Sequence, residues 1–412
     1  MNIKTLLSSQ GFADDEFKEA SYTFDKENIF LTVKAAVKNE VCPHCGGVEH
    51  HIKDYRIKEY KGLKVGIFNT YITEYYPRLK CKSCMRTFTP KKKERSLHKL
   101  TPEYNKAIIK ELKELRSISS IARSFDVSID TVLSILDNDV QCDFAPLGIG
   151  FCIDEFQYKK GSMNDFCCMI LDLINHKVIK ILPNNKISTI EQYFNSINVN
   201  KRLKVGYIAT DMNYTYIKIC KEYFPRAIIA YDPFHYISAF SNAVIDVCKR
   251  VAELPSSSSN LKWLSKNNKL LIKKIEDLKI DSKYKNINDL ESKIRSGVEN
   301  NFELYMAYEY YQIFLYDFAN IKSIKSAKKS LKDLIIVLIE TEIPELVKVA
   351  RMYDKRFDMI INSFKKIKGI RITNGPIEGT NKIAKDLRRI SAGYVSKERF
   401  IKRLSLIINR NK

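Results

Sequence analysis

The sequence predicts a multidomain protein that combines α+β and α/β parts. Three observations predict it: two Cys-x-x-Cys pairs lie near the N-terminus, a short helical hairpin pattern follows them, and apolar strand-like runs that end on acids occupy the middle of the chain. A long Lys-rich helical stretch interrupts this last part. We therefore expect five regions, with the boundaries 1–98, 99–140, 146–252, 253–345 and 346–412.

The composition is that of a globular protein with a large positive charge. The 412 residues include 70 Lys and Arg against 48 Asp and Glu, which gives a formal net charge of +22. Such a surplus attracts polyanions over long range, so we expect nucleic acid as the partner, ahead of an anionic membrane surface. No apolar run approaches the ~20 residues that a spanning helix needs, and the N-terminal apolar run is too short for a signal peptide. We expect a cytoplasmic protein with no membrane association.

The two cysteine pairs predict a structural zinc site. Cys42 and Cys45 form one pair, and Cys81 and Cys84 form the other. Each spacing fits a tight turn that brings two thiolates to ~2.3 Å from one Zn²⁺ ion, and four thiolates complete its coordination. The residues between the pairs alternate in polarity as strands do, so we expect a zinc ribbon. Four free thiols or a redox pair are the alternatives.

A basic run lies between the ribbon and the next element. It contains Lys91, Lys92 and Lys93. A charge run is usually a solvated linker, but one placed between two DNA-binding units can also lie along phosphates. Both interpretations remain open at this point.

Residues 117–136 have the spacing of a helix-turn-helix motif. Ile121 and Ala122 face inward, and Ser128 caps a second helix after a short turn. The polar residues of this second helix are candidates for contacts to base edges, and they are Ser128, Asp130, Thr131 and Ser134. The helix has no Arg or Lys, so its phosphate contacts would come from neighbouring elements. An ordinary helical hairpin is the alternative.

The middle of the chain predicts a mixed sheet with acids at its strand ends. An apolar strand carries Asp154, two more strands follow it as antiparallel partners, and two later strands end on Asp211 and Asp232. This order of strands and helices is ribonuclease-H-like, and ligands gather at strand ends in open α/β sheets. A carboxylate in an apolar strand needs a partner such as a metal ion, because its desolvation is costly. A strand-end Asp that only caps a turn is the alternative for Asp154.

The Lys-rich stretch at 253–345 predicts an all-helical insertion. Aromatic and Met residues recur there near helical spacing, and we interpret them as helix core; they are Phe302, Tyr305, Met306, Tyr310, Phe314 and Phe318. A later helix begins near Pro376 and carries Glu378 in its first turn. The basic residues Lys382, Lys385, Arg388 and Arg389 follow it. An acid at the head of a cationic stripe suits a metal ion beside a phosphate backbone, whereas a Glu378–Lys382 helix pair is the simpler alternative.

Together these motifs resemble the ISL-three family of DDE transposases from bacterial insertion sequences, over roughly residues 40–405. The resemblance rests on Asp154-Glu155-Phe156, Asp211-Met212, Asp232-Pro233-Phe234-His235 and the Asn374–Asn381 motif. It implies a ribonuclease-H-like domain in which Asp154, Asp211 and Glu378 hold catalytic Mg²⁺ (or Mn²⁺) ions for DNA cleavage and strand transfer. Asp232 is the rival for the second acid, and its motif, which includes His235, has no assigned role.

The resemblance also implies the partners of such a protein. These are double-stranded DNA, as terminal inverted repeats and as target, and further copies of the chain in an active dimer or larger assembly in the bacterial nucleoid. The alternative is a zinc-ribbon and helix-turn-helix regulator with a catalytically silent body. A ribonuclease or resolvase is the third possibility. Nicking of repeat DNA in the presence of Mg²⁺ separates the first two.

Overall fold

The computed structural model describes residues 2–37, 40–90, 98–142, 144–158, 165–211, 213–274, 277–278, 286–321, 323–390 and 396–409. The chain forms two compact units, one from residues 1–143 with 386–410 and one mainly from residues 144–385. Both contain a sheet and helices, which confirms the mixed α and β class. The five-region division stays a prediction. No helix in the described ranges is long and apolar enough to cross a lipid bilayer.

The first unit begins with a five-stranded sheet in the order β1-β2-β4-β3, with β5 on β4. The strands are β1 (Phe17–Phe24), β2 (Asn28–Ala35), β3 (His50–Val65), β4 (Phe68–Cys81) and β5 (Thr87–Phe88). β2 and β4 are parallel, and the other pairs are antiparallel. Alternate residues of β2 are buried, as expected for a strand with one face on a core. Helix α1 (Ile3–Ser9) contributes Leu6 and Leu7 to this core.

Four helices form a second cluster in the same unit. They are α2 (Pro102–Leu112), α3 (Ile118–Ser124), α4 (Ile129–Asn138) and, from the end of the chain, α16 (Lys397–Asn409). Thr101, Ser117 and Ser128 each cap a helix by accepting a hydrogen bond from a backbone N–H in its first turn. The shared core includes Ile108 and Val132, and Leu406 of α16 packs against it.

Helix α16 is held in this cluster by a buried arginine. The Arg403 side chain is 0% exposed, its Nε donates to the Leu112 carbonyl at 3.3 Å, and a terminal nitrogen donates to the Glu114 carbonyl at 3.1 Å and to that of Arg116. Leu112 ends α2, where helix geometry leaves carbonyls without intrahelical donors, and Glu114 and Arg116 lie in the segment that leads to α3. Arg399 makes a two-pronged contact to Asp137 on α4, at 2.6–3.0 Å. The C-terminal helix therefore completes a module that begins some 300 residues earlier in the chain.

Arg403→Met is expected to destabilise this helical cluster. Met keeps an apolar stem but removes the side-chain donor from three carbonyls, of which that of Glu114 retains the backbone N–H of Arg116. An unsatisfied buried group costs about 1–3 kcal/mol. We expect the free energy of unfolding of the first unit to fall by about 2–4 kcal/mol in urea denaturation. Arg295→Met is the matched control, because Arg295 is an exposed residue paired within one helix. Equal stability of Arg403→Met and the parent protein would contradict the anchoring role.

The second unit contains a mixed five-stranded sheet in the order β10-β9-β6-β7-β8. Its strands are β6 (Gly150–Gln157), β7 (Phe166–Asp172), β8 (Val178–Leu182), β9 (Tyr207–Thr210) and β10 (Ile228–Tyr231). β7 pairs antiparallel with β6, and β8 pairs antiparallel with β7, whereas β9 and β10 run parallel to β6. The acids named from the sequence therefore belong to three adjacent parallel strands or follow them directly.

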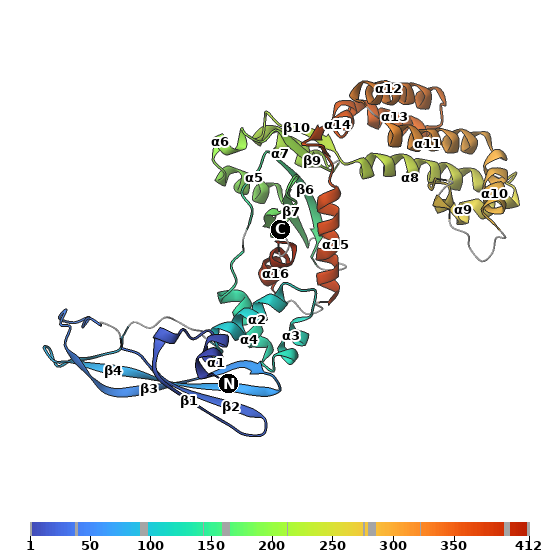
Figure 1. Ribbon diagram of the computed structural model, residues 1–412. Coiled ribbons are helices and arrows are strands. Elements are labelled where there is room, and N and C mark those ends of the chain that lie inside the picture. Colours follow the sequence, from blue (N-terminus) through green and yellow to red (C-terminus); the bar gives the residue numbers. More distant parts are fainter. Residues whose placement is uncertain are drawn as a thin grey trace. The chain divides into compact units, whose positions relative to one another are not determined.

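Helices cover both faces of this sheet. They are α5 (Ile187–Ser196), α6 (Val199–Arg202) and α7 (Tyr214–Tyr223), and, much later, α15 (Gly375–Ile390). Phe151 and Ile153 of β6 share a core with α5 and α7. Cys152 and Asp154 alternate with them and meet α15 instead, which lies alongside the sheet in Figure 1.

A helical region follows β10 and shares one core with α8 (Figure 1). Its elements are α8 (Pro233–Ala252), α9 (Ser259–Lys266), η2 (Asn268–Leu270), α10 (Ile287–Glu299), α11 (Phe302–Asn320), α12 (Ile324–Glu340), α13 (Pro344–Lys355) and α14 (Phe357–Asn362). A hairpin of β11 (Lys366–Ile367) and β12 (Ile370–Arg371) then connects this region to α15. The expected aromatic core is only partly correct. Phe314 and Phe318 are buried, but Phe302 is 75% exposed and Tyr305 40% exposed. The buried stripe of α11 runs instead through Leu304, Tyr308 and Tyr311.

Candidate active site and metal centre

The four cysteines of the first unit converge on one point. The sulfur atoms of Cys42 and Cys84 lie 3.7 Å apart, and those of Cys45 and Cys81 lie 3.6 Å apart. A tetrahedral ion with Zn–S bonds of ~2.3 Å places its sulfur ligands roughly 3.8 Å from one another. The donor set and its spacing therefore fit zinc. In the described part of the chain, this is the only set of three or more His, Cys, Asp or Glu ligands that all lie within 4.8 Å of one another.

The backbone turns shape the cysteine cluster, and the pKa values of two of its thiols shift in opposite directions: contacts with the neighbouring cysteines raise the pKa of Cys45 to about 12, whereas that of Cys81 falls. Gly46, after the first pair, has φ +74°, a conformation that glycine adopts without strain. In the second turn, backbone N–H groups led by that of Cys84 lower the pKa of the Cys81 thiol to about 6. A metal ligand must be deprotonated, so this lowering favours ion binding at neutral pH.

The second unit brings three acids to one edge of its sheet. Strand β9 lies between β6 and β10, and its Thr210 is in register with Ile153 of β6 and with Tyr231 of β10. The next residues along these three strands are Asp154, Asp211 and Asp232. The prediction that the strands carrying Asp154 and Asp211 are neighbours is confirmed.

Helix α15 lies over this acidic edge and contacts it at two points. The Asn381 side chain donates to Asp154 Oδ2 at 2.9 Å, and the backbone N–H of Asn374 donates to Asp232 Oδ1 at 3.3 Å. Glu378 stands between these two contacts in the helix sequence, in the first turn. The helix thus adds a fourth carboxylate to Asp154 within β6 and to Asp211 and Asp232, which directly follow β9 and β10.

The acids stand in an environment that disfavours their ionised forms. Burial, together with the negative charge of Asp211, raises the pKa of Asp154 to about 6. Burial also raises the pKa of Asp211, and burial with the neighbouring Glu378 raises the pKa of Asp232 to about 6. The nearby His235 side chain acts in the opposite direction and lowers the pKa of all three aspartates. Such a cluster is suited to a cation, which would relieve both the repulsion and the desolvation.

Each of two aspartates has another carboxylate close enough to raise its pKa. Asp154 responds to the charge of Asp211, and Asp232 responds to that of Glu378. Asp154, Asp211 and Glu378 are not among the described ligand sets that close within 4.8 Å. Oδ2 of Asp232 is buried without a hydrogen-bond partner, and the His235 Nε2 lies 3.9 Å from it. The structure therefore supplies an open acidic edge whose carboxylates have not drawn together around one point.

Comparison with known proteins identifies the family. A family model described as "Transposase" matches residues 151–404, and one described as "zinc-finger of transposase IS204/IS1001/IS1096/IS1165" matches residues 38–84. The chain belongs to the ISL-three family of transposases. It is also 20% identical over 223 residues to "Transposase for insertion sequence element IS1001" from Bordetella parapertussis. That match covers 53% of the chain and 54% of the relative, so the chain spans about half the length of this curated relative.

The family match bears on two earlier predictions. It confirms the transposase resemblance and does not favour the silent-regulator alternative. The zinc-finger match includes all four clustered cysteines and supports structural zinc over free thiols or a redox pair.

Two residues on or beside the acidic edge have contacts that the sequence did not assign. Asn381 follows Glu378 by three residues, so the two side chains share one side of α15. This spacing is the sequence signal that could have placed Asn381 near Asp154, to which it donates a hydrogen bond. Glu155 points to the opposite face of β6, where it accepts hydrogen bonds from Asn185 at 2.6 Å and from the Tyr216 hydroxyl at 3.3 Å. Its carboxylate is held by these two side chains, and its negative charge also raises the pKa of Asp154 and of Asp211.

The predicted DNA-binding residues have varied surroundings. Ser128 caps α4 and its hydroxyl contacts that of Thr131 at 2.9 Å, while Ser134 accepts from Asn138 at 3.1 Å and Asp130 is exposed. On α15, Lys382, Lys385 and Arg389 are exposed and Arg388 is half-buried. Lys91, Lys92 and Lys93 lie outside the described residues. Their contacts to DNA stay predictions.

Asp154→Asn is expected to stabilise the protein in buffer without Mg²⁺ at pH 8. The pKa of Asp154 rises from 3.8 to about 6 on folding, so the folded form holds the proton more tightly and stability falls as the pH increases from about 4 to 6. The amide cannot ionise, so we expect a gain of roughly 1–3 kcal/mol at pH 8 and none at pH 4, measured by urea denaturation. Asp333→Asn, at an exposed position, is the control and should show no such pH dependence. A variant that is less stable than the parent at pH 8 would show that ionised Asp154 does not destabilise the folded protein.

Proposed function

We propose that the chain is a metal-dependent DNA transposase that binds the terminal inverted repeats of an insertion sequence and cleaves and joins DNA strands at Asp154, Asp211 and Glu378. The observation that carries the proposal is the docking of α15 on the acidic edge within the region that matches the transposase model. Adjacent parallel strands supply the aspartates, and the helix supplies the glutamate.

The topology supports a ribonuclease-H-like catalytic domain. Three antiparallel strands are followed by two that run parallel to the first, with helices between them, in the order β10-β9-β6-β7-β8. The region from α8 to α14 is then the helical insertion that separates Asp232 from Glu378. In the first unit, α3, the short turn with Asp126 at φ +49°, and α4 support a helix-turn-helix motif.

The residues at the acidic edge fit Mg²⁺ or Mn²⁺. Their side-chain ligands are carboxylate oxygens, which these hard cations prefer, and Oδ2 of Asp232 is buried with no donor to satisfy it. Asp154, Asp211 and Glu378 would hold the ions, with Asp232 as the rival second ligand. When bound, such ions activate a water or a DNA 3′-hydroxyl and stabilise the charge that develops on the phosphate.

The protein groups around the acids set their orientation. Asp154 has one oxygen at the Glu155 N–H (2.8 Å) and the other at the Asn381 amide, so its carboxylate plane is fixed. Asp211 Oδ1 accepts from the Asn213 N–H at 3.1 Å. His235, exposed to 39% in its side chain, stands beside the aspartates, where it can meet an incoming phosphate. Preorganised ligands of this kind reduce the reorganisation needed when DNA arrives.

The deciding experiment is a cleavage assay. The purified protein is mixed with a duplex that carries the repeats flanking its gene, with and without Mg²⁺, and strand ends are mapped on a gel. We expect nicks at the repeat ends only with Mg²⁺. Binding without nicks would favour the regulator, and preferential cleavage of RNA would favour the ribonuclease. Because two ends must be joined, the active form is at least a homodimer, and it works at the nucleoid.

A further inference from the structure

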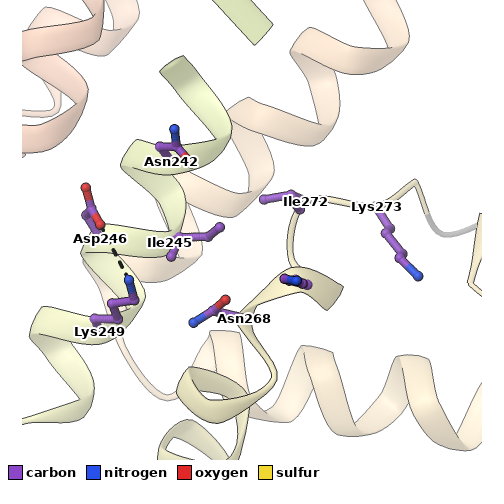
Figure 2. A pocket seen from close by; sticks show the side chains of 8 residues that line it. Asn242, Ile245, Asp246, Lys249, Asn268, Ile272 and Lys273 are labelled. Carbon is purple, nitrogen blue, oxygen red and sulfur yellow. Dashed lines mark ion pairs between the residues drawn. The ribbon is translucent and has the colours of Figure 1, made fainter. Parts of the chain in front are cut away.

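The helical region has a groove with basic walls. It has a volume of about 630 Å³ and lies between α8 and the short segment around η2. Its lining consists of Asn242, Ile245, Asp246, Lys249, Asn268, Lys269, Ile272 and Lys273. Figure 2 shows Lys249 on α8 and Lys273 on the opposite wall, with Asn268 between them.

The charge in this groove favours an anion. Three lysines face one acid, Asp246, whose carboxylate lies 4.0 Å from the Lys249 ammonium. All three lysines are exposed, and two amide side chains stand among them as further donors. The groove is open rather than enclosed by apolar side chains, so it suits an extended polyanion better than a small apolar ligand.

The wall that carries Lys269 and Lys273 is held in place by α11. The Gln312 side chain donates to the carbonyls of Leu271 at 3.2 Å and Lys273 at 3.1 Å. Leu271 is fully buried in the helical core. These contacts anchor the backbone of the segment that carries both lysines beside the groove.

We propose that this groove holds the phosphate backbone of double-stranded DNA, which gives the helical region a contact to DNA separate from the acidic edge. The inference rests on the proposed function. Lysine ammonium groups bind phosphates as point charges without reading bases, so the contact is independent of sequence. A duplex is favoured over an acidic protein segment because the chain carries a formal net charge of +22 and belongs to a family of transposases.

The test is the salt dependence of DNA binding by the full-length protein. Lys269→Ala/Lys273→Ala removes two ammonium groups, and the affinity for a 50-base-pair duplex of random sequence is measured by fluorescence anisotropy between 50 and 300 mM NaCl. Each lost phosphate contact lowers the slope of log K against log salt by ~0.9, so we expect a slope smaller by ~1.8. Lys269→Arg/Lys273→Arg keeps both charges and should retain the parent slope. If the Arg variant keeps the parent slope, the effect of the Ala variant comes from the lost charges and not from a change in the structure of the groove.

Matched controls separate this groove from a general charge effect. Lys328→Ala/Lys329→Ala removes two exposed lysines of α12 that do not line the groove, and the slope should change by less than half a unit. Equal losses in both double variants, or no loss at the groove, would overturn the proposal. Absence of duplex binding by the parent protein would instead refute the proposed function. Cleavage at saturating DNA should be unchanged in the groove variant, because the acidic edge is intact.

Discussion

Asp154→Asn, Asp211→Asn and Glu378→Gln are each expected to abolish Mg²⁺-dependent cleavage of repeat DNA, with a rate loss on the order of 10³-fold or more. Each amide keeps the shape of the side chain but loses the charge that holds a divalent cation. Affinity for the repeats should stay within about twofold, because the zinc ribbon and α4 are unchanged. Single-turnover cleavage of an end-labelled duplex and anisotropy on the same duplex measure the two effects.

Two neighbouring carboxylates make this experiment discriminating. Glu155→Gln is the control for a neighbouring charge, because Glu155 raises the pKa of Asp154 and Asp211 while Asn185 and Tyr216 hold its carboxylate. We expect this variant to keep most of the cleavage activity. Asp232→Asn tests whether Asp211 or Asp232 is the second carboxylate that binds the metal ions. Loss of cleavage in Asp232→Asn with near-normal cleavage in Asp211→Asn would transfer the assignment to Asp232, which is the carboxylate coupled to Glu378.

Removal of zinc should unfold one end of the N-terminal sheet and abolish repeat binding. From the sequence, loss of zinc is expected to unfold about the first 95 residues. The structure predicts that a smaller part unfolds, because the cysteines lie in a small core of their own. This core consists of Cys42, Leu79, Cys81 and Phe88 and is separate from the core that contains Leu31 and Ile72. Structural zinc contributes about 10–16 kcal/mol in isolated fingers, far more than so small a core provides. Hydrogen exchange in Cys45→Ser should show lost protection from Leu79 to Phe88 and retained protection in β2.

His44→Ala is the matched control for the zinc site. His44 is exposed and lies within the first Cys-x-x-Cys turn, but four cysteines already supply the ligands. We expect one zinc per chain in the parent and in His44→Ala, by metal analysis, and a large loss in Cys45→Ser. Retention of zinc by Cys45→Ser together with its loss in His44→Ala would show that the ligand set is wrong.

Local patterns in the sequence determined the secondary structure and the chemistry of this transposase-family chain. Cys-x-x-Cys spacing is a property of a single turn, so Cys42, Cys45, Cys81 and Cys84 were identifiable as one ligand set. The caps at Thr101 and Ser128 and the apolar strands before Asp211 and Asp232 are equally local. The aromatic spacing in α11 was misleading for Phe302, because a residue in the first turn of a helix can keep the period and still face solvent.

Only the tertiary structure decided which of these elements meet. Asn381 reaches Asp154 across 227 positions, Arg403 reaches the end of α2 across 291, and Gln312 fixes the groove wall. Such contacts depend on how helices and sheets pack, and periodicity within one element carries no information on its distant partner. The coupling of Asp232 with Glu378 likewise arises from burial and proximity, which raise a pKa only after the chain has folded.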